Sequence, residues 1–370
     1  MSDKTYTLLF FENKFSEVSD KDFIETYKSI VEVPNQDIVI TLIREVWDWS
    51  SFNDWIKSIQ ASLSRYNHTV YFIVNSTFNY SEVDDSLHKY IFSIDFFLSD
   101  AVFRYRYDQT LKINAKWNSD NSQVLFLSGK PDYYNRYQPV LYLSQQGRLH
   151  DFVYSYHGTK ISDLRDINMF YPNQSNIVNT LKKLSNILDI EFQRNHYSGY
   201  PFDPNLYKNT VLSLIPEGVL DYHTSGLIDI KDLPYSYSPL NAPFITEKTY
   251  RAILNHHPFI ILGEMNSLKY LESIGFKTFR EYLKYPDYNE VELLQDRILY
   301  GIENSLYFLD TYKKYQSDIE RDTKHNFENL IKIANSQWNS ISLFNDRKLF
   351  LDFYLNCSYE LDRKDISKID

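Results

Sequence analysis

Residues 243–263, PFITEKTYRAILNHHPFIILG, hold the side chains whose types and spacing best suit chemistry. Thr246 is a good helix N-cap, and we expect it to leave the first-turn amides and the positive end of the helix dipole in open solvent. Such a helix end can bind a phosphate, to which Lys248 and Arg251 would add positive charge. Glu247 can accept hydrogen bonds from two hydroxyl groups of a ribose or a sugar. One helical turn therefore offers groups for both ends of a sugar nucleotide.

The same segment has simpler interpretations. Glu247 and Arg251 are spaced i,i+4 and could form an ordinary ion pair on a helix that only precedes a strand. His256 and His257 stand where this helix should end, and we expect cationic imidazoles there to interact favourably with the negative end of the dipole. We expect no metal site at these histidines and His223, because the spacing brings no carboxylate or cysteine into register.

Charged side chains also follow two other predicted strands in this half of the chain. Lys130 and Arg136 come after the strand at 124–127, where a bound phosphate would need them. Neither a GxxxxGK[ST] loop nor a GxGxxG motif is present, and surface charge at a turn would explain the two cations equally well. Glu217 follows the strand at 210–215, where the simpler interpretation is a solvated loop.

A third group of polar side chains follows the strand predicted at 37–43. Asp48 or Glu45 could act as a general base that takes a proton from an acceptor hydroxyl. Trp47 or Trp49 could stack on a sugar or a base. Alternatively, the tryptophans belong to the core and the acids cap the helix that follows.

Composition limits the class of protein. The chain has 370 residues, 43% hydrophobic and 24% charged, as expected for a globular protein with two domains of ordinary size. The net charge of -10 argues against nucleic-acid binding through overall charge but leaves room for a local basic cleft. The single cysteine, Cys357, excludes an intramolecular disulfide. No apolar run reaches about 18 residues and the N-terminus MSDKTYTLLFF has no signal-peptide pattern, so we expect a cytoplasmic protein without a membrane span.

Strands and helices alternate along the chain. In the first part we predict strands at 6–11, 37–43, 70–74 and 91–97, with helices at 20–30 and 51–64. After a polar linker at 107–121 we predict strands at 124–127, 152–156, 210–215 and 259–263, with helices at 135–146, 176–188 and 247–256. A helix–strand piece follows at 268–279, and the chain is mainly helical from 290, with helices at 317–336 and 346–355.

This alternation predicts an α/β protein with two Rossmann-like domains that face each other across a cleft, followed by C-terminal helices. The predicted boundaries are 1–115 for the first domain, 120–345 for the second and 346–370 for the terminal helix and tail. In open α/β sheets, ligands bind beyond the carboxyl ends of the strands. The residues just after the predicted strands are therefore the ones where we expect a site.

The segment PFITEKTYRAILNHHPFIILG, followed by LKYLESIGFKTF, resembles the second half of GT-B glycosyltransferases. It is most similar to the Thr-Glu-Lys signature of fucosyltransferase-like enzymes and their phage-encoded relatives. Asn135-Arg136 ahead of SQQGRLHDFVYSY, and Glu217 in SLIPEG, resemble two further elements of these relatives. The resemblance covers about residues 124–300, and its Thr-Glu-Lys stretch is the most specific part.

Two positions depart from the family pattern. Gln138-Pro139 stands where the relatives often have a second basic residue. Asn255 takes the second position of the Glu-x7-Glu spacing that many retaining GT-B enzymes carry.

The resemblance implies a metal-independent glycosyltransferase that uses a nucleoside diphosphate sugar as co-substrate and needs no cofactor. It implies that the second domain binds this donor, through Thr246, Glu247, Lys248, Arg251, Glu217, Arg136 and Lys130. The first domain would bind the acceptor, with Asp48 or Glu45 as the base if the reaction inverts.

The acceptor has two alternatives: a glycan, or a hydroxymethylated base in DNA, which the phage-encoded relatives suggest. A duplex would require a flipped base and a basic strip, for which Arg104, Arg106, Lys112 and Lys116 form a local cluster. A different class of function also fits the pattern, namely a non-catalytic nucleotide-binding or assembly protein with a GT-B shell.

Overall fold

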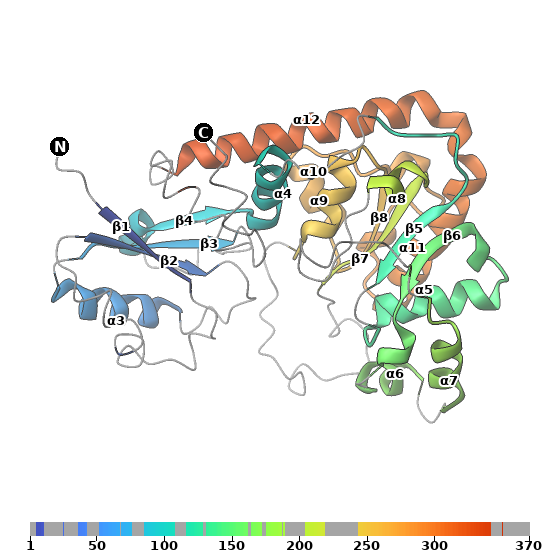
Figure 1. The fold of residues 1–370 in the computed structure, drawn as a ribbon, viewed down its shortest axis with the longest axis horizontal. Coiled ribbons are helices and arrows are strands. Elements are labelled where there is room, and N and C mark those ends of the chain that lie inside the picture. The colour runs from blue at the N-terminus through green and yellow to red at the C-terminus, as the bar shows by residue number, and fades with distance from the viewer. Residues whose placement is uncertain are drawn as a thin grey trace. The chain divides into compact units, whose positions relative to one another are not determined.

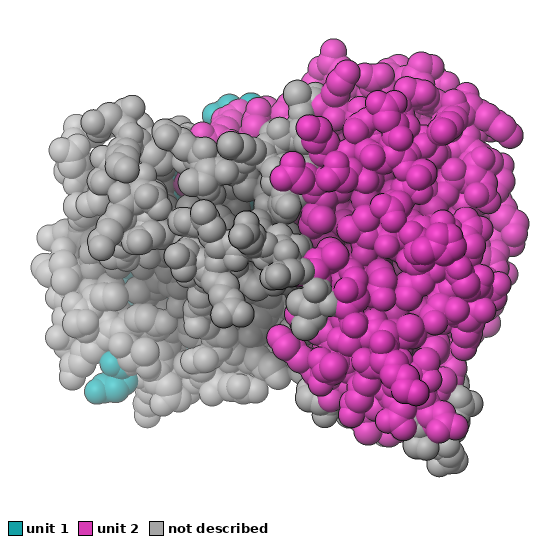
Figure 2. Space-filling view, turned by 45° about the vertical axis from the view of Figure 1, so that its right-hand side comes forward, with its two compact units in different colours: residues 1–100, 233–242, 335–365 teal, residues 101–232, 243–334, 366–370 magenta. Residues whose placement is uncertain are grey.

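The computed structural model (Figure 1) describes residues 5–10, 25, 36–42, 52–66, 68–75, 85–107, 116–128, 131–161, 164–171, 175–186, 188, 204–218, 243–341 and 350. The chain divides into two compact units, coloured teal and magenta in Figure 2. Unit 1 comprises residues 1–100, 233–242 and 335–365, and unit 2 comprises residues 101–232, 243–334 and 366–370. Each unit contains a four-stranded sheet whose strands are all parallel. The predicted α/β class with two parallel sheets is therefore confirmed.

The sheet of unit 1 has the strand order β1-β2-β3-β4. Its strands are β1 (Thr5–Phe10), β2 (Gln36–Leu42), β3 (Val70–Asn75) and β4 (Ile91–Ile94). Three consecutive residues of β2, Ile38 to Ile40, are fully buried, as expected for a strand covered on both faces. Helix α3 (Phe52–Ser64) buries Ile56, Ile59 and Leu63, which are spaced to lie on one helix face. The order of these four strands is sequential, so it does not reverse among them.

The sheet of unit 2 has the order β6-β5-β7-β8. Its strands are β5 (Val124–Ser128), β6 (Phe152–Tyr156), β7 (Leu212–Pro216) and β8 (Phe259–Leu262). The chain proceeds from β5 to β6 on one side and then to β7 and β8 on the other, so the order reverses between β5 and β7. Right-handed crossovers then place α5 (Tyr134–Gln145) and α9 (Glu247–Leu254) on opposite faces of the sheet (Figure 1).

The C-terminal part is helical, as predicted. Helix α11 (Leu294–Thr311) packs on β7 and β8, and a short 3-10 turn, η11 (Tyr312–Tyr315), leads into α12 (Gln316–Ser340). Shorter helices are α6 (Arg165–Phe170), α7 (Ser175–Lys183), α8 (Pro204–Lys208) and α10 (Ser267–Ser273), with 3-10 turns η4 (Asp85–Tyr90), η5 (Leu149–Asp151), η6 (Gly158–Lys160), η9 (Arg280–Tyr282) and η10 (Tyr288–Glu290). None of the helices in these ranges is long and apolar enough to cross a membrane.

Two predicted elements end earlier than their patterns indicate. The strand predicted at 91–97 ends at Ile94, and a helix, α4 (Phe96–Tyr107), begins where Asp95 accepts the N–H of Leu98 at 3.1 Å. Asp95 is thus a helix N-cap within an aromatic stretch that reads as a strand. The helix predicted at 176–188 ends at Lys183, because the backbone of Asn186 pairs with Tyr156 at the end of β6.

The strand predicted at the end of 268–279 is wrong. Helix α10 ends at Ser273, and Gly275 adopts a left-handed conformation with φ of 91°. The backbone N–H and C=O of Lys277 then bond to the side-chain amide of Asn326 in α12, at 2.7 and 2.8 Å. A side chain therefore satisfies the backbone groups that a neighbouring strand would otherwise bond.

The helices predicted at 20–30 and 346–355 lie outside the described residues, apart from Glu25 and Phe350, which are both helical.

Candidate functional site

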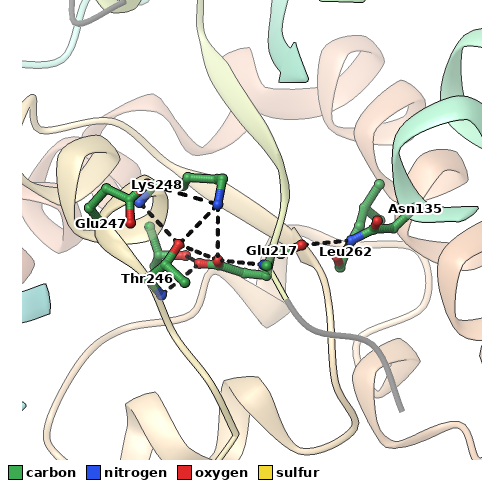
Figure 3. Close-up of polar contacts among 8 residues, drawn as sticks. Asn135, Glu217, Thr246, Glu247, Lys248 and Leu262 are labelled. Carbon is green, nitrogen blue, oxygen red and sulfur yellow. Dashed lines mark hydrogen bonds and ion pairs between the residues drawn. The ribbon is translucent and has the colours of Figure 1, made fainter. Parts of the chain in front are cut away.

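The candidate site lies at the carboxyl edge of the second sheet, where the strand order reverses. Asn135, in the first turn of α5, is fully buried. Its side-chain N–H groups donate to the backbone oxygens of Glu217 at 3.1 Å and Leu262 at 2.6 Å (Figure 3). The start of α5 is therefore tied to the ends of both β7 and β8.

Glu217 directly follows β7, and its carboxylate is bonded on both oxygens. Oε1 accepts the N–H of Thr246 at 3.2 Å and the hydroxyl of Thr249 at 2.6 Å. Oε2 accepts the hydroxyl of Thr246 at 2.5 Å and the N–H of Gly218 at 3.2 Å. Only 2% of Glu217 is exposed. The interpretation of Glu217 as part of a solvated loop is thus wrong.

Thr246 is the N-cap of α9, as predicted, with Oγ1 accepting the N–H of Lys248 at 3.4 Å. The expectation that this helix start lies in open solvent is wrong. Thr246 is only 3% exposed and Thr249 is fully buried. The carboxylate of Glu217 already lies against the positive end of the helix, where a negative charge is stabilised.

Lys248 extends from the first turn of α9 over the same carboxylate (Figure 3). Its ammonium donates to the hydroxyl oxygen of Thr246 at 3.3 Å. It lies 4.0 Å from Glu217 Oε2 and 3.9 Å from Glu247 Oε1, both at the outer limit of an ion pair. The side chain keeps 14% of its surface exposed. The ammonium is therefore held at a defined place by a side chain that is not completely buried.

The buried hydroxyl of Tyr207, in α8, is affected by two charged residues of α9. Burial raises the pKa of Tyr207 to about 12, while Arg251 lowers it and Glu247 raises it. The charges of Arg251 and Glu247 therefore both act on this buried hydroxyl. The i,i+4 ion pair between Glu247 and Arg251 stays a prediction.

Asn255 and the two histidines close the other end of α9. The side chain of Asn255 donates to the carbonyl of Arg251 at 2.9 Å and so caps the helix C-terminus. This local role explains an amide at position 255.

The prediction of cationic imidazoles at this helix end is wrong. Burial lowers the pKa of His257 to about 4 and also lowers the pKa of His256. His257 lies 2.8 Å from the hydroxyl of Ser213 through Nδ1 and 2.9 Å from the carbonyl of Thr210 through Nε2. His256 stacks on Phe327, with ring centroids 4.5 Å apart. Both rings are neutral parts of the packing around α9 and the strands.

Arg136 belongs to the same edge of the sheet, next to Asn135 in α5. It is 3% exposed, and its guanidinium lies 4.9 Å from the ring centre of Tyr133. The structure thus gathers Arg136, Glu217 and the first turn of α9 at the carboxyl edge. Lys130, Asp48, Glu45, Trp47 and Trp49 lie outside the described residues, as do Lys112 and the side chain of Arg104.

Sequence reasoning missed a second buried carboxylate, Glu264, at the end of β8. It is 5% exposed, and its Oε2 accepts the N–H of Phe244 at 2.6 Å. Glu217 and Glu264 therefore fix the extended segment 243–246 that leads into α9. A usable signal was present, because an acid comes one or two residues after the end of each of these buried strands, in SLIPEG and in IILGEM.

Among the described residues, no group of three or more His, Cys, Asp or Glu side chains is arranged to hold a metal ion. No known family model matches the chain, and comparisons with curated proteins and with solved structures found no match either.

Proposed function

We propose that the protein is a GT-B glycosyltransferase that moves a sugar from a nucleoside diphosphate sugar to an acceptor hydroxyl. The observation that carries this proposal is the ammonium of Lys248, which is held at the start of α9 on the carboxyl edge of the second sheet. Open α/β sheets bind their ligands where the strand order reverses, and this edge lies at such a reversal. The two parallel sheets and the helical C-terminal part are compatible with the family that the sequence resembles.

In this proposal the second unit binds the donor. Lys248, Arg251, Arg136 and Lys130 stabilise the negative charge that develops on the diphosphate as the glycosidic bond breaks. Glu247, whose side chain is 19% exposed, accepts hydroxyls of the sugar or the ribose. Thr246 and Glu217 hold the helix start in place.

The acceptor belongs to the first domain in this proposal. If the reaction inverts, Asp48 or Glu45 removes the proton of the acceptor hydroxyl while its oxygen bonds to the anomeric carbon and the nucleoside diphosphate leaves. The acceptor is a hydroxymethylated DNA base or a glycan. We place the reaction in the cytoplasm, which for a phage-encoded enzyme is that of the host.

The donor site is tested by thermal unfolding with UDP, GDP, CMP, dTDP and ADP and their sugars. A ligand at a hundred times its Kd stabilises the native state by about 2.7 kcal/mol, so one nucleotide should raise the melting temperature clearly. Lys248→Ala should abolish the shift. Lys324→Ala is the matched control, because Lys324 is an exposed lysine of α12 in the same unit. A flat response to every nucleotide would overturn the proposal.

The acceptor is tested with the nucleotide sugar identified in that screen. Oligonucleotides with a hydroxymethylated base and a panel of glycans are incubated with the donor, and mass spectrometry records any added sugar. Binding of a DNA acceptor should weaken steeply with salt, whereas binding of a glycan should not. Donor binding without transfer or donor hydrolysis under any condition would favour the non-catalytic alternative.

A further inference from the structure

We infer that Glu217 is a positioning residue that sets the place of the Lys248 ammonium and does not itself bind the donor. The identity of the anion that Lys248 meets rests on the proposed function. The positioning rests only on contacts within the protein.

Donors within the protein already occupy both oxygens of the Glu217 carboxylate, so it is not placed to accept a ribose hydroxyl. Its two oxygens together accept four hydrogen bonds, from Thr246 N–H, Thr246 O–H, Thr249 O–H and Gly218 N–H. With 2% of the residue exposed, a ligand hydroxyl would have to displace one of these donors. Removing a donor from a buried carboxylate is costly, so displacement is unfavourable.

Besides the direct ion-pair distance of 4.0 Å, the hydrogen bonds from Glu217 to the Lys248 ammonium run through one hydroxyl group, that of Thr246. Thr246 has one O–H proton, and this proton is donated to Glu217 Oε2. The lone pairs of the same oxygen are thereby turned toward Lys248, whose backbone N–H and ammonium both donate to it. Without the Glu217 carboxylate, the Thr246 hydroxyl would be free to rotate, and the ammonium would lose a fixed acceptor.

The backbone of Glu217 also contacts the start of α5, the helix that carries Arg136. Its carbonyl accepts the side-chain N–H of Asn135, and its own N–H donates to Leu262 at 3.1 Å. Asn135 is the neighbour of Arg136 in the first turn of α5. Glu217 therefore links the starts of α5 and α9, through its contacts with Asn135 and Thr246 (Figure 3).

Glu264 provides a matched comparison. It is also a buried glutamate that follows a strand, and it fixes the same segment through Phe244, two residues before Thr246. If any loosening of this segment displaced Lys248, changes at Glu264 and at Glu217 would act alike. If Glu217 positions Lys248 through the Thr246 hydroxyl, only changes at Glu217 should do so.

The first test is the acetylation rate of Lys248 with acetic anhydride, measured by mass spectrometry and normalised to the exposed Lys324 in the same chain. Lys248 should react slowly in the wild type and several-fold faster in Glu217→Ala. Glu217→Gln keeps one acceptor oxygen, so it should recover part of the slow rate. Glu264→Ala and Glu264→Gln should leave the rate unchanged. If Glu217→Ala does not fold, the acetylation rates of Lys248 in Glu217→Gln and Glu264→Gln are compared instead, and only Glu217→Gln should show a faster rate than the wild type.

The second test is the affinity for inorganic pyrophosphate, measured by calorimetry on the same variants. Loss of one well-placed charged contact should weaken binding roughly tenfold in Glu217→Ala, and less in Glu217→Gln. An unchanged Lys248 acetylation rate in the Glu217 variants, or an equal rise in the Glu264 variants, would overturn the inference. The wild-type protein could also bind neither pyrophosphate nor any nucleotide. If the Lys248 acetylation rate then still rises only in the Glu217 variants, the positioning role of Glu217 is supported and the proposed function is refuted.

Discussion

At the scale of single residues, the carboxylate of Glu217 is an anion that the protein itself places at a helix start. Burying a carboxylate is unfavourable unless strong donors replace water. Two backbone N–H groups and two threonine hydroxyls supply those bonds here, and the positive end of α9 adds to them. The start of α9 is therefore defined by contacts from a residue 29 positions earlier in the chain.

Thr246 should be the most sensitive partner of this carboxylate. Thr246→Ala removes the N-cap acceptor and one hydroxyl donor to Glu217, so the free energy of unfolding should fall by about 2 kcal/mol. Thr246→Ser keeps the hydroxyl and should cost less than half as much. Urea denaturation followed by circular dichroism measures both values, and equal losses in the two variants would contradict this role of the hydroxyl.

His257 should make stability depend on pH. Its pKa is about 4 in the folded protein, lowered by burial from an unfolded value of about 6.5. Between these values the unfolded chain binds a proton that the folded protein does not. The free energy of unfolding should therefore fall as the pH drops from about 6.5 to about 4, by about 3 kcal/mol in total.

His257→Gln is the control for this pH dependence, because an amide can still donate to Thr210 and accept from Ser213 without titrating. Denaturation at several pH values should give a flatter pH profile for this variant than for the wild type. Identical profiles would show that His257 is not the titrating group.

At the scale of elements, η6 and α7 approach each other so closely that only glycine fits. A Cβ atom at Gly158 would lie 2.2 Å from the backbone oxygen of Leu181. Gly158→Ala should therefore force the two elements apart and cost about 2 kcal/mol. Gly218→Ala is the matched control, because its Cβ would meet Thr246 at an ordinary 3.5 Å. Thermal unfolding of both variants measures the difference, and an equal effect would refute this close approach.

Most elements of the second sheet could be predicted because their signals are local. β6 and β8 are short apolar runs, and the start of α9 has its own cap, Thr246. The strand wrongly predicted at the end of 268–279 could not be judged locally, because the backbone of Lys277 bonds to Asn326, 49 positions away. The same limit applies to the site, since the place of Glu217 after a strand was visible but its burial and pairing with Thr246 were not.

At the scale of the whole molecule, α12 takes part in both compact units. The boundary between the units falls after Ala334, inside this helix. On the side of unit 1, Gln337 accepts the hydroxyl of Ser99 at 2.7 Å, and Trp338 packs edge-on against Phe350. On the side of unit 2, Leu330 is fully buried. One helix thus contributes core residues to two separate units.

This division predicts that two substitutions on one helix act on different sheets. Trp338→Ala removes a large side chain that is 8% exposed, and Leu330→Ala removes a fully buried side chain about two turns earlier in the helix. Each substitution leaves a cavity and should lower the stability of its own unit by about 3 kcal/mol. Hydrogen exchange followed by mass spectrometry should show faster exchange in β1 to β4 for Trp338→Ala and in β5 to β8 for Leu330→Ala. Each variant serves as the control for the other. If either substitution accelerated exchange equally in both sheets, the two units would unfold as one, and nucleotide binding in the second unit would then also protect the first.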